Sequence, residues 1–163
     1  MNPSAIFGIN VLMSLTSATV AAGLFAWPRL RVARGEQALQ WLVAPHMFLR
    51  FIGLSFLVPG VVSASVPKAW ATPAAYGDFV AGILAIIATV GLARAAAWAM
   101  TAVRIFNIWG AADLLFAFYR GARVSLAQDP GALGPGYYLV TAIVPLLLVS
   151  HALIFALLAR TKS

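Results

Sequence analysis

Five polar residues interrupt otherwise apolar stretches of the sequence, and their chemical types indicate binding of an anion or a cofactor. They are two histidines, two arginines and an asparagine, namely His46, Arg50, Arg104, Asn107 and His151. Guanidinium groups pair with carboxylates and phosphates, and imidazole is a common axial ligand of haem iron. Whether such chemistry can occur depends on the elements that bring these side chains together.

The spacing of these residues predicts that they share one layer. His46 and Arg50 are four residues apart and Arg104 and Asn107 are three apart, so each pair lies on one face of a helix. At 1.5 Å per residue, all five fall about 6 to 15 Å from the same side of the expected membrane spans. We expect a buried polar layer in the cytoplasmic half, provided that the helices carrying it are neighbours.

The expected layer is cationic, because no acidic residue falls at its depth. Asp113 lies about 13 Å further along its helix than Arg104 and faces a different direction. We expect Asp113 to meet Asn10 or Arg120, so that Asn10 and Asp113 are polar residues of the outer half. Buried cations need acceptors such as backbone carbonyls, lipid phosphates or a bound anion.

Three interpretations of the layer remain open. The arginines could reach lipid phosphates while the histidines bond across helices. The layer could bind or translocate a small anionic or polar ligand, or belong to an accessory membrane subunit. It could also hold haem b for electron transfer, with His46 and His151 as the axial ligands of the metal and the arginines pairing with the propionates.

A catalytic function has less support in the sequence, and we expect a protein that is not an enzyme. There is no cysteine, which excludes thiolate chemistry, and there are only four acidic residues. No nucleophile with its base and no metal-binding motif is recognisable. An enzyme acting on a lipid is the second alternative to the binding function.

The composition indicates that the lipid bilayer is the solvent of these elements. Of the 163 residues, 63% are hydrophobic and 9% are charged, whereas soluble domains carry about 25% charged residues. The apolar stretches do not alternate with polar residues, which favours helices over a β-barrel. We expect an all-α integral membrane bundle, with residues 1–163 forming a single domain.

Five apolar stretches are long enough to cross about 30 Å of hydrocarbon. The expected transmembrane helices cover about 5–27, 42–64, 76–92, 97–119 and 137–158. Residues 76–119 are almost continuously apolar, but one helix over them would be about 66 Å long, so we divide them at Arg94. Four spans and one re-entrant or broken helix are the alternative. Pro45, Pro59 and Pro145 are expected to bend the helices that contain them.

The basic residues between the spans predict the orientation. One side of the membrane receives Arg29, Arg31, Arg34, Arg94, Arg160 and Lys162, and the other receives only Lys68, Arg120 and Arg123. Cytoplasmic loops carry the excess of basic residues, so we expect a multi-pass protein of the cytoplasmic (inner) membrane with its N-terminus outside.

The expected partners follow from this placement. They are the lipid bilayer, an anionic small molecule or lipid headgroup, and a second copy or another subunit. Nucleic acid is not among them, because the net charge of +7 lies between apolar spans rather than on a basic surface with aromatic residues.

Overall fold

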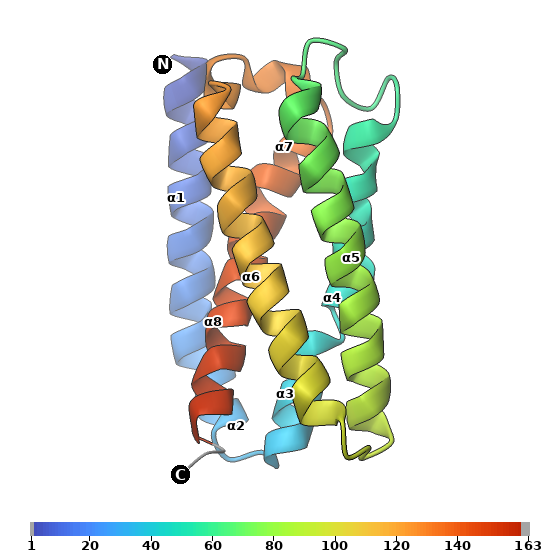
Figure 1. The fold of residues 1–163 in the computed structure, drawn as a ribbon. Coiled ribbons are helices and arrows are strands. Elements are labelled where there is room, and N and C mark those ends of the chain that lie inside the picture. The colour runs from blue at the N-terminus through green and yellow to red at the C-terminus, as the bar shows by residue number, and fades with distance from the viewer. Residues whose placement is uncertain (1, 161–163) are drawn as a thin grey trace.

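The computed structural model describes residues 2–160, and Lys162, which the orientation argument used, lies outside the described residues. Within this range the chain is helical and has no strand, with only an isolated bridge between Pro59 and Val62. The helices lie side by side along one axis and form an elongated bundle (Figure 1). The expected all-α class is therefore confirmed.

In the described part of the chain, four helices are long and apolar enough to cross a membrane, namely Pro3–Leu30, Lys68–Ala93, Ala99–Arg123 and Gly136–Arg160. The second and third are α5 (Lys68–Ala93) and α6 (Ala99–Arg123). The first combines α1 (Pro3–Ala21), a π-helical segment (Ala22–Ala26) and α2 (Trp27–Leu30). The last combines α7 (Gly136–Tyr138), a π-helical segment (Leu139–Ile143) and α8 (Val144–Arg160). They correspond to four of the five expected spans.

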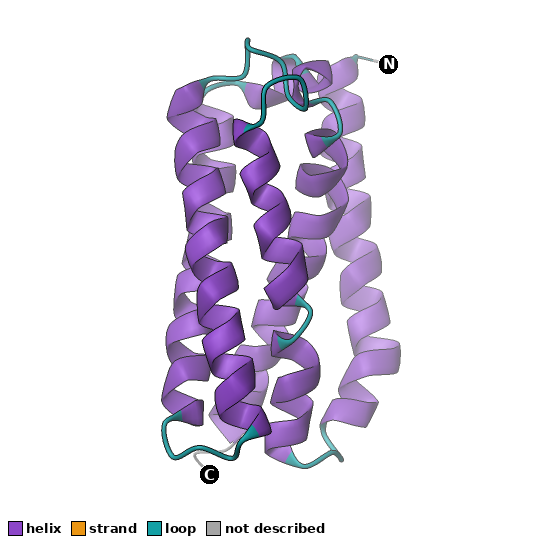
Figure 2. Ribbon diagram, turned by 90° about the vertical axis from the view of Figure 1, so that its right-hand side faces the viewer, coloured by secondary structure: helices purple, strands orange, loops and turns teal. Residues whose placement is uncertain are grey.

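The remaining expected span, 42–64, is not a single long helix. This part of the chain forms α3 (Gly35–Val43), α4 (His46–Leu49) and a 3-10 helix (Arg50–Leu57), followed by a loop that contains Pro59. Pro45 lacks a backbone N–H and its ring clashes with the preceding turn, so the helix breaks there (Figure 2). The broken segment packs against α5.

The division of residues 76–119 is confirmed, and the turn between α5 and α6 includes Ala95 in the left-handed conformation (φ 47°). However, α5 begins well before the expected start at residue 76 and continues through Pro73. Pro73 leaves the carbonyl of Ala69 without its helical donor, and Arg120 of α6 donates to that carbonyl instead. The two helices therefore pair as an antiparallel hairpin.

Each π-helical segment comes shortly before a proline. Pro28 follows Ala22–Ala26, and Pro145 follows Leu139–Ile143. Proline has no backbone N–H, so one carbonyl of the preceding turn loses its donor. The wider π-helical turn shifts the hydrogen-bond register of the residues just before the proline. The predicted distortion near Pro145 is thus present, whereas Pro59 lies beyond the helical residues.

Two apolar clusters occupy the two ends of the bundle interior. One includes Leu39, Val103 and Ile154, and the other includes Phe56 and Trp70. Five buried polar side chains lie between the two clusters, namely His46, Arg50, Asp78, Asn107 and His151. This polar layer is the candidate functional site.

Candidate functional site

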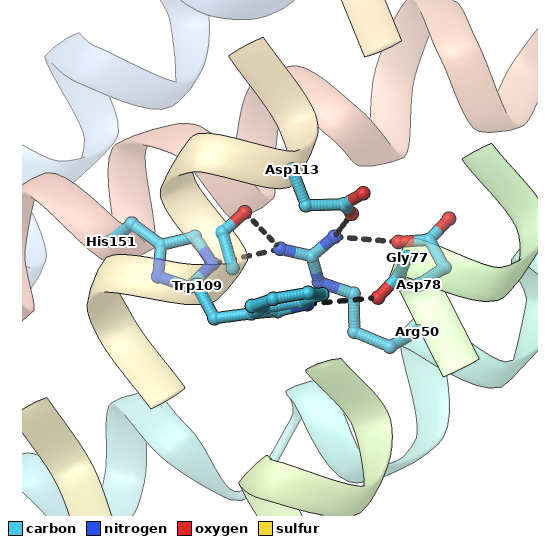
Figure 3. A network of polar contacts seen from close by, with 7 residues as sticks. Arg50, Gly77, Asp78, Trp109, Asp113 and His151 are labelled. Carbon is cyan, nitrogen blue, oxygen red and sulfur yellow. Dashed lines mark hydrogen bonds and ion pairs between the residues drawn. The ribbon is translucent and has the colours of Figure 1, made fainter. Parts of the chain in front are cut away.

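Arg50 is at the centre of the polar layer (Figure 3). Its side chain is fully buried. Its Nη1 atom donates to Asp78 Oδ1 at 2.5 Å and to Asp113 Oδ2 at 3.1 Å. Its Nη2 atom donates to the carbonyl of Gly110 at 2.6 Å and to His151 Nε2 at 2.9 Å. One guanidinium group therefore joins α5, α6 and α8.

The hydrogen bonds of His151 determine its tautomer. A guanidinium nitrogen can only donate, so Nε2 of His151 must accept from Arg50. Nδ1 then carries the proton and donates to Oδ1 of Asn107 at 2.7 Å, and Nδ2 of Asn107 donates to the His151 carbonyl at 3.3 Å. His151 is thus a neutral imidazole with both ring nitrogens satisfied.

His46 lies against His151 but is outside this hydrogen-bond network. The two ring centroids are 4.6 Å apart, and both rings contact Phe106. Nε2 of His46 is 3.1 Å from the hydroxyl of Ser150. Nδ1 of His46 is buried and has no hydrogen-bond partner in the described part of the chain.

Three glycines make room for the network. A Cβ atom at Gly110 would lie 2.5 Å from Cε1 of His151 and 2.9 Å from Nη2 of Arg50. Cβ atoms at Gly53 and Gly77 would overlap the carboxylates of Asp78 and Asp113, respectively. The backbone must come this close to the polar groups, so only glycine fits these positions.

The pairing of α5 and α6 sets both carboxylates at one level. Asp78 lies about 15 Å from the first residue of α5, and Asp113 lies about 15 Å from the last residue of α6, at 1.5 Å per residue. Because the helices are antiparallel, these two ends meet at the same end of the bundle. Arg50, on the neighbouring broken segment, reaches both carboxylates.

An apolar cavity of about 340 Å³ ends at these carboxylates. Among residues 2–160, Asp78 and Asp113 are the only charged residues that line it, and their side chains are 9% and 11% exposed. Its walls include Phe56, Trp70 and Phe118, and the loop after α6 also contributes. The cavity lies on the side of the layer opposite to the α5–α6 turn.

Comparison with known protein families assigns this chain to one of them. A family model described as a domain of unknown function, DUF8737, matches residues 6–159. The chain belongs to this family. No curated protein and no solved structure matches it. The match includes every residue of the network, so the polar layer is part of the DUF8737 domain.

The DUF8737 domain brings together four of the five side chains that the sequence grouped. His46, Arg50, Asn107 and His151 are all buried and lie in one layer, but Arg104 is exposed and lies outside it. The buried face of α6 is formed by Val103, Phe106, Asn107 and Gly110. Arg104 is only about 60° from Asn107 around the helix, but it lies about 100° from Val103, on the far side of Asn107, and so falls outside this face.

The predicted pairing of Asp113 with Asn10 or with Arg120 is wrong for this domain, because Arg120 donates to the carbonyl of Ala69. Asn10 donates to the Tyr137 hydroxyl at 2.6 Å, and Asp113 pairs with Arg50. The prediction of a layer without acids is therefore also wrong. The depth estimate for Asp113 used its backbone position alone, whereas the long side chain of Arg50 reaches along the bundle axis to it.

Asp78 is the residue that the sequence interpretation missed. The expected span begins at residue 76, so Asp78 falls at the very end of that span and the segment around Pro73 falls in a connection. In the DUF8737 domain α5 already begins at Lys68, so Asp78 lies inside the bundle. The tryptophan and alanines of the sequence AWATPAA, which are typical of a membrane helix, were the available signal for this earlier start.

The two histidines do not fit a haem held by two axial imidazoles. A porphyrin would have to lie between the rings, but their centroids are only 4.6 Å apart. Both nitrogens of His151 are also occupied, by Arg50 and Asn107. Among the described residues, no group of three or more histidine, cysteine, aspartate or glutamate side chains could hold a metal ion.

Proposed function

We propose that this protein is a polytopic integral membrane protein that binds a small organic cation with an apolar body. The ligand would occupy the cavity that ends at Asp78 and Asp113. The observation that carries the proposal is the pair of carboxylates in the cavity wall, which share one guanidinium.

The charges of the network favour a cation. Asp78 and Asp113 contribute two negative charges when ionised, Arg50 contributes one positive charge, and His151 is neutral by its hydrogen bonds. With both carboxylates ionised, the buried site carries one net negative charge that the single guanidinium does not balance, which is unfavourable. An ammonium group would neutralise it, and the aromatic walls would enclose the apolar body of the ligand.

The same network argues against the anionic ligand that the sequence suggested. That prediction required arginines without a counter-ion. Arg50 already has two carboxylates, and Arg104 lies outside the layer. An anion at this position would add a third negative group to a single guanidinium.

The proposed topology has five crossings, with the broken segment of α3, α4 and the 3-10 helix as the second. The turn from α2 to α3 and the turn from α5 to α6 lie at the end of the bundle that also contains the end of α8 (Figure 1). By sequence these two turns include Arg29, Arg31, Arg34 and Arg94. This distribution supports a cytoplasmic location for that end, in an inner membrane, with the N-terminus outside. The cavity then opens toward the outer side.

The proposal is tested with 2-phenylethylamine, a cation small enough for the cavity, on the full chain in lipid nanodiscs. The matched probes are 2-phenylethanol, which lacks the charge, and 3-phenylpropionate, which reverses it. We expect the amine to raise the melting temperature and to bind measurably by calorimetry, and the carboxylate not to bind. Asp113→Asn should weaken amine binding by roughly tenfold or more, because a charged hydrogen bond is lost.

Two further variants make this experiment decisive. Glu36→Gln removes the same charge from an exposed position on α3 and should leave amine binding unchanged. Ala117→Leu reduces the cavity volume without altering the carboxylates and should abolish binding. Equal binding of the amine and the alcohol, or full amine affinity in Asp113→Asn, would overturn the proposal.

A further inference from the structure

A second cavity, of about 460 Å³, forms a groove on the side of the bundle, which we call the lateral groove. It is bounded by α1 and the π-helical segment Ala22–Ala26, by the break between α3 and α4, and by α8. It shares no lining residue with the carboxylate cavity. Its exposed side chains include Phe25, Trp41 and Leu146, so the groove opens to the surroundings of the bundle.

The groove results from small side chains on one wall and a broken helix on the other. Ala18, Ala22 and Ala26 are four residues apart, so their methyl groups follow one side of the first helix and fill little space. Pro45 lies on the opposite wall, where the chain is interrupted between α3 and α4. Among residues 2–160 no charged residue lines the groove. Its walls therefore suit hydrocarbon rather than water.

The lateral groove extends along the bundle axis for less than the depth of one leaflet. On the first helix it runs from Ala18 to Ala26, about 12 Å, and on α8 from Leu146 to Leu153, about 10 Å. One leaflet contributes half of the hydrocarbon of a bilayer, or about 15 Å. Ala26 directly precedes α2, so the groove lies in the leaflet on the side of the α2–α3 turn.

Cationic groups adjoin the groove at the α2–α3 turn. Nη1 of Arg29 donates to the carbonyl of Phe25 at 2.5 Å, and Phe25 is itself part of the groove wall. Arg29 is exposed, and this bond uses only one of its five N–H groups. Arg31 and Arg34 follow in the turn and are also exposed, and Glu36 at the start of α3 is the nearest acid in sequence. Three arginines and one glutamate leave this end of the groove positive.

These arginines have no counter-ion in the described part of the chain, because all the ion pairs among residues 2–160 involve Arg50. Guanidinium groups bind phosphate oxygens through charged hydrogen bonds, and basic residues at a membrane surface attract anionic lipids. A free phosphate ion would leave the apolar groove open, and a zwitterionic lipid would bring no net charge. An anionic phospholipid matches both the groove and the arginines.

We propose that the lateral groove binds an anionic phospholipid, with one acyl chain along the alanines of the first helix and the phosphate hydrogen-bonded to Arg29. The acyl chain supplies packing contacts that the open groove lacks. Arg31 and Arg34 favour a headgroup with a net negative charge. This site rests on the membrane location proposed above, but it is independent of the amine site, which lies in the other half of the bundle.

The test places the full chain in phosphatidylcholine vesicles that contain increasing fractions of phosphatidylglycerol with brominated acyl chains. Bromine quenches nearby tryptophan fluorescence, and Trp41 lines the groove. The difference between the natural chain and Trp41→Phe isolates the Trp41 signal. The matched lipid is phosphatidylcholine with the same brominated chains. We expect brominated phosphatidylglycerol to quench Trp41 at a fraction roughly tenfold lower, because several arginines attract its headgroup.

Trp98 is an internal control for general attraction of anionic lipids to this end of the bundle. It lies in the turn from α5 to α6 beside Arg94, is exposed and lines neither cavity. Trp98→Phe isolates its signal in the same way. The preference for phosphatidylglycerol should be smaller at Trp98 than at Trp41, because only one arginine adjoins it in sequence and the groove does not reach it.

Two variants separate the headgroup contact from the seat of the acyl chain. Arg29→Gln should lower the preference at Trp41 by roughly threefold or more, whereas Arg94→Gln should leave it unchanged. Ala18→Leu fills the groove, keeps every arginine and should lower the preference to the level at Trp98. Circular dichroism checks that each variant keeps the helical content of the natural chain.

A preference at Trp41 no larger than that at Trp98 would overturn the proposal, and so would an unchanged preference in Arg29→Gln or in Ala18→Leu. Insensitivity of Trp41 to both brominated lipids, which a second copy seated on the groove would cause, would also overturn it. Asp113→Asn, in the other cavity, should leave the lipid preference unchanged. Failure of amine binding and failure of lipid binding are therefore separate outcomes.

Discussion

Arg50 connects more polar groups of the bundle than any other described side chain. It donates to two carboxylates, to the Gly110 carbonyl and to His151. Burial of these groups is tolerable only because each acceptor receives a hydrogen bond from the guanidinium. Removing the guanidinium would leave Asp78 and Asp113 side by side with no cation.

We predict that Arg50→Met lowers the free energy of unfolding by about 3–5 kcal/mol, as measured by unfolding in mixed micelles. The matched variant is Arg104→Met, which removes the same group from an exposed position. It should change stability by less than about 0.5 kcal/mol. Similar losses in the two variants would show that Arg104 also has a buried role, contrary to the structure.

At the scale of elements, the close approach of α6 to its neighbours depends on glycine. The Gly110 position leaves space for the imidazole from α8 and the guanidinium from the broken segment. Because these two groups are held by several hydrogen bonds, neither can move aside without losing a partner. A methyl group here would therefore displace whole elements rather than one flexible side chain.

We expect Gly110→Ala to destabilise the bundle by about 1–3 kcal/mol, the usual cost of overpacking a filled interior. Thermal unfolding in the same micelles measures it. Gly8→Ala is the control, because no atom lies within 4 Å of the added Cβ atom on α1. There, loss of glycine flexibility should leave stability unchanged or raise it by up to about 1 kcal/mol. Equal melting temperatures for the two variants would contradict the packing described here.

At the scale of the whole molecule, four continuous helices and one broken segment form the bundle. An even number of crossings would leave both chain ends on one side of a membrane, whereas five crossings place them on opposite sides. The proposed topology therefore depends on whether residues 35–57 pass through the membrane despite the break at Pro45.

Cysteine labelling tests this topology directly, because the natural chain contains no cysteine. Cysteines at positions 68 and 94 flank α5 and should react with a membrane-impermeant maleimide from opposite sides of intact cells or vesicles. A cysteine at position 34 should react from the same side as position 94. If position 34 instead labels with position 68, the segment 35–57 does not cross as proposed.

The sequence by itself determined the helical class, the turn near Arg94 and the burial of His46, Arg50, Asn107 and His151. Each of these follows from local properties, because continuous apolar stretches and helical spacing are visible in the chain without knowledge of its neighbours. The distortion near Pro145 follows in the same way, since proline removes a donor wherever it occurs in a helix.

Only the tertiary structure decided which groups meet Arg50. The start of α5 at Lys68 brought Asp78 inside, and the rotation of α6 turned Asp113 inward and Arg104 outward. It also brought the two imidazoles into contact, which excludes a porphyrin between them. Helix ends and rotations depend on packing between distant segments. The charge of the layer, on which the proposed class of ligand rests, therefore could not be derived from the spacing of residues along the chain.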